Sequence, residues 1–470
     1  MDSTTAVPAQ PGGKSGVLIN RNFALLFAGF SISSIGDFVF TTTLVLWIAV
    51  RLTAGLSWSP LAVSGALLAA SVPIFLVGPL AGVFVDRWNK RGTMLRAAVF
   101  QAVAVALLLG VSGIVPVPGM LGGQLPIRWT LGVIYGVVFL VNAANQFNNP
   151  ASMALLGDIV NEPERARAAG LTQVVSALAV IIGPPVAALL FVFGVQWALL
   201  LDAASFVVAF GCVLLIRAPR AAVSVAQGER GHFAREFGQG FAFFFRSRVL
   251  VTLLIAALLA MLGAGALNAL DVFFVTGKDY LNQPASLYGF AGAAQGVGIL
   301  LGAIVASALA YKFGLTRTIW VAVLILGATI VAWSRMTLFI PALITLFIGG
   351  IAQAALNVAA GPLLLAVTPR ELVGRVTAVL QPLITGASLI SIALAGYLVS
   401  TVLVGFHASA FGVRFGPIDS IFLVAGGLII LSGLYAMVMW RGVRVAAPKA
   451  DGAGEAGTTT PAPEAVPVVG

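Results

Sequence analysis

The stretch GPLAGVFVDRWNKR, residues 78–91, decides the fold. It joins two apolar segments, residues 61–85 and 94–114, and each is long enough to cross the hydrocarbon core of a bilayer, which takes about 20 helical residues. Three basic residues and one Asp fall within its last six positions, as in a short charged loop at a membrane surface. The stretch therefore predicts two membrane-spanning helices joined on one side of a bilayer.

The rest of the chain has the same apolar character. Of its 470 residues, 60% are hydrophobic and 9% are charged, whereas a typical soluble domain has about 25% charged residues. So few charges cannot cover the surface of a soluble protein of this size, and a disordered chain would need low hydrophobicity. We therefore predict twelve spans, at residues 23–50, 61–85, 94–114, 130–156, 169–193, 196–216, 249–275, 287–310, 318–334, 338–366, 373–399 and 418–440.

Several classes of protein are excluded by what the sequence lacks. The single cysteine, Cys212, excludes a disulfide scaffold and a cysteine-based metal site, and His232 and His407 are too far apart in sequence to suggest a histidine-rich one. The nucleotide-binding pattern G-x-x-x-x-G-K-[ST] is absent. A membrane-embedded transferase would need His, Asp or Glu clustered at an interface, and a sensor would need a soluble output domain. We therefore expect no enzyme and no cofactor, with a proton gradient as the energy source.

The distribution of basic residues predicts the orientation. If the N-terminus is cytoplasmic and the spans alternate, 21 of the 26 Lys and Arg residues fall on the cytoplasmic side. This asymmetry places both termini in the cytoplasm of a multi-pass plasma (inner) membrane protein. The net charge of +10 is spread over many cytoplasmic segments, so anionic lipid headgroups are a sufficient partner and we expect no nucleic-acid binding.

The predicted organisation is two groups of six spans. Polar, low-complexity sequence at both ends predicts disordered cytoplasmic tails. A faint repeat supports duplication, because the loops NEPERARAAGL and TPRELVGRVTAVL each follow the fourth span of a group. The predicted parts are a tail at 1–20, a six-helix bundle at 21–216, a cytoplasmic linker with an amphipathic helix at 217–248, a second six-helix bundle at 249–441 and a tail at 442–470.

The loop at residues 78–91 also carries a family resemblance. Its part GVFVDRWNKR resembles the signature between the second and third spans of the major facilitator superfamily: Gly, three residues, Asp-Arg, two residues, two basic residues. Asn89 stands where the family usually has Gly, and in the second half Tyr311 replaces the Asp. The resemblance implies an all-α polytopic membrane protein with twelve transmembrane helices in two pseudo-symmetric six-helix bundles.

The fifth span is similar to the antiporter motif of that superfamily. The small residues Gly170 and Gly183, with Pro184, keep its spacing, while Ala occupies three other glycine positions. Generic packing of small residues between helices is the alternative interpretation. The segments LLFAGFSISSIGDFVFTTTLVLW, NQFNNPASMALLGDIV and PRELVGRV resemble the drug and siderophore exporters of the superfamily, those similar to macrolide efflux pumps and the enterobactin exporter.

The resemblance further implies a conformational latch on the cytoplasmic side. In the family, the loop acid pairs with an Arg after the fourth span and caps the eleventh span, here near Pro369. This pairing would hold the outward-open state and release when the bundles rock. The residues that would form the latch are Gly82, Asp86, Arg87, Arg91, Arg165 and Arg167.

Polar residues inside the spans are the candidates for transport. An Asp at a helix centre costs about 2.5–3.5 kcal/mol, and Asp37 lies near the middle of the first span. We predict that Asp37 couples transport to protons, with a structural Asp bonded to Ser, Thr or Asn as the alternative. Asp202 and Asp271 lie toward the outer ends of their spans, where hydration favours a structural role.

Amide side chains predict the substrate cavity. They crowd one face of the fourth span, and such a face must meet water or other polar groups. Hydrogen bonding between helices is the alternative to a cavity. The predicted lining residues are Asn142, Asn145, Gln146 and Asn149 in the first half and Asn268, Gln295, Gln353, Asn357 and Gln381 in the second.

These features together predict a secondary transporter. We expect a monomer that expels amphipathic drugs or small metabolites in exchange for protons by alternating access. The alternative is a proton-coupled importer of a small nutrient in the same fold. Such an importer would need a more polar binding cavity than the few polar residues in these spans suggest.

Overall fold

The computed structural model describes residues 19–85, 87–111, 126–217, 244–369, 372–410, 413–443 and 445. Within them, twelve helical segments are long and apolar enough to cross a membrane, which confirms the predicted fold class. Most of the predicted tails and most of the predicted linker helix lie outside the described residues.

The first bundle is built from the N-terminal half of the chain. Its elements are α1 (Arg21–Leu46) with the π-helical turn η1 (Trp47–Leu52), α2 (Ser59–Leu76), α3 (Gly78–Val85), α4 (Lys90–Val111), α5 (Ile127–Ile159), the short 3₁₀ helix η2 (Glu162–Glu164), α6 (Arg165–Phe193) and α7 (Val195–Leu215).

The second bundle is built from the C-terminal half. Its elements are α9 (Arg248–Thr276), α10 (Ala285–Phe313), α11 (Leu315–Trp333), α12 (Phe339–Val367), α13 (Val373–Tyr397) with the π-helical turn η3 (Leu398–Val402), a hairpin of β1 (Ala408–Ala410) and β2 (Val413–Phe415), and α14 (Pro417–Met439).

The predicted second span is two helices in the structure. Helix α2 ends at Leu76 and α3 begins at Gly78. Proline has no backbone N–H to donate and glycine weakens a helix, so Gly78-Pro79 accounts for the interruption at Val77. Helix α3 then packs against α5.

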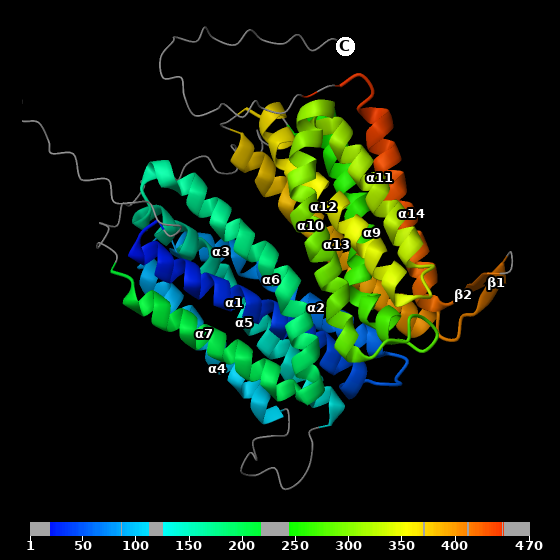
Figure 1. Cartoon of the computed structure of the whole chain (residues 1–470), viewed down its shortest axis with the longest axis horizontal. Helices are drawn as coiled ribbons and strands as arrows, with labels where there is room; N and C mark the ends of the chain where they lie inside the picture. Colours follow the sequence, from blue (N-terminus) through cyan, green and yellow to red (C-terminus); the bar gives the residue numbers. More distant parts are fainter. Residues whose placement is uncertain are drawn as a thin grey trace, which may run out of the picture.

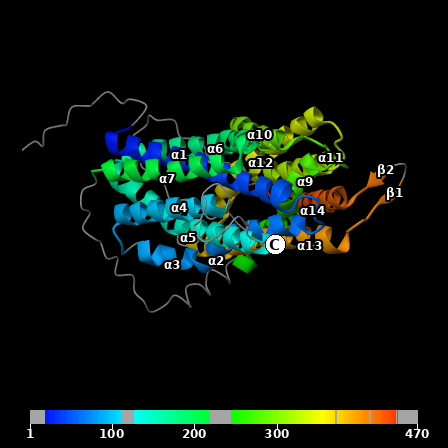
Figure 2. The same ribbon diagram turned by 90° about the horizontal axis from the view of Figure 1, so that it is seen from below.

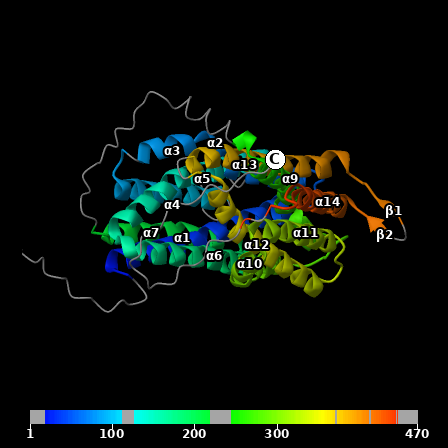
Figure 3. The ribbon, with the colours of Figure 1, turned by 90° about the horizontal axis from the view of Figure 1, so that it is seen from above.

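The two bundles converge near the β hairpin and diverge toward the start of α1 and the end of α14 (Figure 1). We call these the hairpin end and the terminal end of the molecule. Seen from below and from above, the first bundle lies to the left and the second to the right (Figures 2 and 3). The bundles meet mainly where α6 packs along α10 and α2 packs along α13, and α2 also contacts α9.

Close backbone approach seals the hairpin end. A Cβ atom added at Gly289 of α10 would collide with the backbone carbonyl oxygen of Pro184 in α6, and one added at Gly396 of α13 would collide with the Ser64 hydroxyl of α2. Beyond these contacts, the backbone N–H of Leu61 donates to Ser400 Oγ at 3.0 Å. The structure is therefore closed toward the hairpin end.

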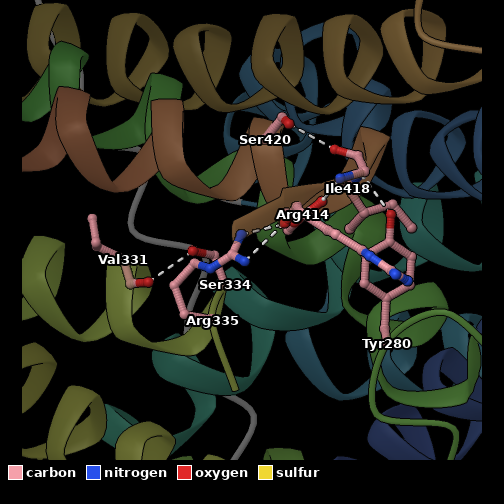
Figure 4. Close-up of polar contacts among 9 residues, drawn as sticks. Tyr280, Val331, Ser334, Arg335, Arg414, Ile418 and Ser420 are labelled. Atoms are coloured by element: carbon pink, nitrogen blue, oxygen red, sulfur yellow. Dashed lines mark hydrogen bonds and ion pairs between the residues drawn. The ribbon is translucent and has the colours of Figure 1, made fainter. Parts of the chain in front are cut away.

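A polar cluster stabilises the hairpin end of the second bundle. Arg335 Nη1 donates to Asp419 Oδ2 at 2.9 Å, and Arg335 Nη2 donates to the carbonyl oxygen of Arg414 at 2.9 Å (Figure 4). Asp419 Oδ1 accepts from the backbone N–H of Gly416 at 2.7 Å, which caps the start of α14. The cluster thus ties α11, the hairpin and α14 together.

Tyr280 completes this cluster. Its hydroxyl oxygen accepts from the backbone N–H of Ile418 at 3.0 Å (Figure 4). Burial raises the pKa of Tyr280 to about 12, so its hydroxyl group is neutral at physiological pH.

We expect Arg335→Ala to lower the free energy of unfolding by about 1–2 kcal/mol. Hydrogen bonds to charged groups contribute about 1.5–3 kcal/mol each, but the Arg335 side chain is 33% exposed, so solvent screens part of this. Thermal unfolding of the purified protein measures the change. The matched control is Arg128→Ala at an exposed arginine of α5; an equal loss in both variants would contradict the role given to Arg335.

Candidate functional site

A polar cavity lies inside the first bundle. Its volume is about 60 Å³, room for several water molecules. Helices α1, α4, α5 and α7 contribute its walls, and one side of α1 contributes Asp37. The polar side chains that line this first-bundle cavity are Ser33, Ser34, Asp37, Gln101, Asn145, Asn148, Asn149 and Ser152.

Asp37 is partly buried at this cavity, and a second carboxyl group lies on the neighbouring helix. A Cβ atom added at Gly36 of α1 would lie 2.7 Å from Asp202 Oδ1 of α7. Asp202 is fully buried, and neither of its carboxylate oxygens has a hydrogen-bond partner among the described residues. Ser205, which lies beside it, donates to the backbone carbonyl of Asp202 at 2.7 Å. The expected hydration of Asp202 is therefore wrong, because Gly36 lets α1 pack directly against it.

A buried amide pair forms another part of this cavity. Gln101 of α4 is 1% exposed and its Nε2 donates to Asn145 Oδ1 of α5 at 2.8 Å. Gln101 is not among the residues predicted from the sequence, although an uncharged polar residue within an apolar span is the signal that indicates it. Gln101 and Asn145 join two helices by a hydrogen bond, and both also line the cavity. The two alternatives for the amide side chains, interhelical bonding and cavity lining, therefore apply to the same residue, Asn145.

A larger cavity lies between the bundles. Its volume is about 380 Å³, and four helices of the second bundle line it together with Thr42 of α1 and Pro184 of α6. Asp271, which the sequence places toward the outer end of its span, lines this inter-bundle cavity. The other polar side chains of the lining are Asn268, Tyr288, Gln295, Thr329, Trp333, Thr345 and Gln353.

The structure divides the predicted amide set. Asn145 and Asn149 line the first-bundle cavity, and Asn268, Gln295 and Gln353 line the inter-bundle cavity. The remaining four residues are absent from both linings. Among these, Asn142 and Gln146 donate to backbone carbonyls one turn back in α5, Asn357 is exposed and accepts from Gln353 at 3.2 Å, and Gln381 is exposed.

The loop after α3 makes its described polar contacts within the first bundle. Lys90 Nζ lies 2.8 Å from Asp158 Oδ2, at the end of α5. Arg91 donates from Nε to the carbonyl oxygen of Val213 at 3.1 Å and from Nη2 to that of Leu214 at 2.6 Å, which caps the end of α7.

The other residues of the predicted latch are placed as follows. Arg165 Nη2 donates to the carbonyl oxygen of Gly157 at 3.1 Å, within the same bundle. Gly82 lies in α3, Arg87 is exposed, and Arg167 lies in the first turn of α6. Asp86, the acid of the latch, lies outside the described residues.

The small residues of α6 form its contacts with two other helices. A Cβ atom at Gly183 would collide with Phe38 of α1, and Pro184 lies against α10. Ala179, Ala187 and Ala188 are fully buried, whereas Gly170 has open space around it. The motif therefore places α6 between α1, which carries Asp37, and the second bundle.

Two helical bundles with polar residues enclosed along their interface define a membrane transporter architecture. The family model described as Major Facilitator Superfamily matches residues 25–283. The chain belongs to the major facilitator superfamily, and it is a multi-pass membrane protein.

Relatives with curated names agree with this family. Macrolide efflux protein A of Streptococcus pyogenes is 27% identical over 261 residues, which are 55% of this chain and 60% of that protein. The chain thus spans about three fifths of the length of this relative. The uncharacterized MFS-type transporter YfiS of Bacillus subtilis (strain 168) is 24% identical over 433 residues, covering 89% of this chain and 93% of that protein.

Solved structures show the same fold. A bacterial homologue of the iron transporter ferroportin in an inward-facing state has a TM-score of 0.68 and 14% identity, covering 89% of this chain and 98% of that one. The nucleoside transporter NupG has a TM-score of 0.66 and 12% identity, covering 90% and 99%. The family and the fold are those of transporters.

Proposed function

We propose that the chain is a secondary active transporter that exports amphipathic drugs or small metabolites in exchange for protons. The observation that carries this proposal is the position of Asp37, a carboxyl group at a polar cavity inside an apolar bundle. A group that costs about 2.5–3.5 kcal/mol to place at mid-membrane marks an ion or proton pathway by default. The macrolide efflux relatives support the outward direction.

Alternating access follows from the arrangement of the bundles. In this structure the bundles are held together at the hairpin end by α6 with α10 and α2 with α13, and they diverge at the terminal end (Figure 1). Rocking about the inter-bundle cavity would break the contacts of Gly289 and Gly396 and close the terminal end. Asp86 would then pair with Arg165 or Arg167 as the proposed latch.

The proposed setting is a bacterial inner membrane with the terminal end in the cytoplasm. Most Lys and Arg residues lie in segments predicted to be cytoplasmic, where they would contact anionic lipid headgroups. Because side chains of a single chain line both cavities, one chain is sufficient as the transporting unit. The proton gradient is the proposed energy source, since one proton crossing 100 mV supplies about 2.3 kcal/mol. The proposal includes no cofactor and no nucleic-acid partner.

Everted membrane vesicles test this function. Vesicles that contain the protein and are supplied with a panel of amphipathic compounds should accumulate at least one of them when respiration acidifies the lumen. An uncoupler should abolish the accumulation. Accumulation that persists with the uncoupler, or its absence across the panel, would contradict proton-coupled export of this class of compound.

A proton-coupled importer of a small nutrient is the second candidate. The observation that favours it is the set of amide side chains at the inter-bundle cavity, which could bind a polar solute. The same measurement in right-side-out vesicles separates the two directions, since an importer accumulates its substrate there when the outside is acidic.

A further inference from the structure

A groove opens on the outer face of the first bundle. Helices α4 and α7 pack along each other there, on the side away from the second bundle (Figure 1). The groove has a volume of about 440 Å³. Its apolar lining is Leu95, Val99, Phe100 and Val103 of α4 with Phe210 of α7, and Arg96 of α4 is the charged residue of the lining. The groove is therefore an apolar surface with a cation beside it.

The length of the groove is close to the thickness of one lipid leaflet. From Leu95 to Val103 the helix rises about 12 Å, and one leaflet of hydrocarbon is about 15 Å thick. Val99, Phe100 and Val103 are between 46% and 56% exposed, so the described residues leave about half of each side chain uncovered. One extended acyl chain of a lipid matches the groove in length and in chemistry.

Arg96 lies within the span rather than at its surface end. Six residues, or about 9 Å, separate it from Lys90, which begins α4 and pairs with Asp158. Arg96 is exposed, and no hydrogen bond or ion pair joins it to another described residue. An arginine at such a depth costs free energy unless its long side chain reaches an anion or water near the interface. The side chain of Arg96 therefore needs a partner from outside the bundle.

The surroundings of Arg96 supply no acid from α4 or α7. Helix α4 contains no Asp or Glu, and Asp202, the one acid of α7, is fully buried against α1. Arg91, five residues before Arg96, donates to the carbonyl oxygens of Val213 and Leu214 at the end of α7. These bonds hold the two helices together beside the groove and leave the Arg91 charge without a carboxylate. The surface end of the groove is therefore positive.

We propose that this groove binds one anionic phospholipid, with an acyl chain along α4 and the phosphate group at Arg96. Basic pockets between membrane helices bind anionic headgroups in this manner. The acyl chain alone gives no selectivity, since all lipid tails are as apolar as the groove. The charge of the headgroup decides, because a zwitterionic lipid brings its own cation next to Arg96. The site does not rest on the proposed transport function.

Quenching by brominated lipids measures which lipid occupies the groove. Leu107→Cys, at an exposed position one turn beyond Val103, is labelled with a bimane fluorophore in a Cys212→Ala background. The purified full chain is reconstituted in phosphatidylcholine vesicles that contain a small fraction of phosphatidylglycerol brominated on its acyl chains. A second set contains the same fraction of brominated phosphatidylcholine. We expect the brominated phosphatidylglycerol to quench the fluorophore at least threefold more strongly.

Two variants separate the charge of the site from its shape. Arg96→Gln should make the two lipids quench equally, because it removes the cation and keeps a polar side chain. Its matched control is Arg248→Gln, at an exposed arginine that begins α9, and this variant should keep the preference. Val99→Trp should remove the preference by filling the groove while Arg96 stays in place. Its control is Val174→Trp, at an equally exposed valine of α6.

Several outcomes would overturn the proposal. Equal quenching by both lipids in the Leu107→Cys protein would do so without any further variant having to fold. Quenching by neither lipid would show that another segment covers the groove. The same preference for phosphatidylglycerol at Ile304→Cys, an exposed position of α10, would show general attraction of anionic lipids to the protein instead of a site. Loss of the preference in Arg248→Gln as well as in Arg96→Gln would lead to that same conclusion.

Discussion

Asp37→Asn should reduce proton-driven accumulation in everted vesicles to the level seen with an uncoupler. Asparagine preserves the size of the side chain, but it cannot bind and release a proton. In the proposed cycle, Asp37 takes up a proton from one side of the membrane and releases it on the other, so its loss breaks the link between gradient and substrate. Vesicle uptake of one exported compound measures the effect.

Exchange of labelled for unlabelled substrate without a gradient should persist in Asp37→Asn, because the inter-bundle cavity remains intact. The matched control is Asp158→Asn, which removes an acid that forms a surface ion pair with Lys90. We expect near-normal accumulation in the control, since exposed ion pairs contribute about 1 kcal/mol or less. Wild-type accumulation in Asp37→Asn would remove this residue from the mechanism.

Cross-linking the hairpin end should arrest transport. The backbone of Leu61 in α2 and the side chain of Ser400 in η3 are joined by a hydrogen bond between the bundles. Cysteines at these two positions, placed in a Cys212→Ala background and joined by a short thiosulfonate linker, would prevent the bundles from separating there. We expect accumulation to fall to background in the cross-linked protein and to recover after reduction.

The two single-cysteine variants treated with the same reagent control for modification of either position alone. They should retain most of the accumulation, because one attached group does not join the bundles. Full transport by a protein shown to be cross-linked would contradict rocking about the inter-bundle cavity.

The sequence predicted the architecture well because the bilayer imposes it on the composition. Twelve apolar segments and the loop at 78–91 were sufficient for the spans, the two bundles and the family. Asp37 and Asn145 were selected because polar groups in apolar spans are costly, and the structure brings both to one cavity. Their roles remain predictions that the variants above test.

The surroundings of the other acids could not be predicted from position along a helix. Depth in the membrane follows from residue number, whereas burial depends on which neighbouring helix comes close. Asp202 is buried because Gly36, on a different helix, leaves room for it. Asp271 lines the inter-bundle cavity together with residues of α10 and α11. The sequence of α9 alone does not specify which of its faces points toward those helices.

The partners of the latch residues could not be predicted from the sequence either. Their spacing indicated the family, but partner choice depends on the conformation of the whole molecule. In this structure Arg91 caps α7 and Arg165 binds the end of α5, both within the first bundle. With the terminal end open, contacts across the bundles at that end are not required.

Movement of protons during transport tests the central claim most directly. Proteoliposomes that contain the purified protein and a trapped pH-sensitive dye are given an outward gradient of one exported compound, with no initial pH gradient. Wild-type protein should drive protons inward as the compound leaves, and Asp37→Asn should not. Substrate that leaves the wild-type proteoliposomes with no change in internal pH would contradict proton-coupled export.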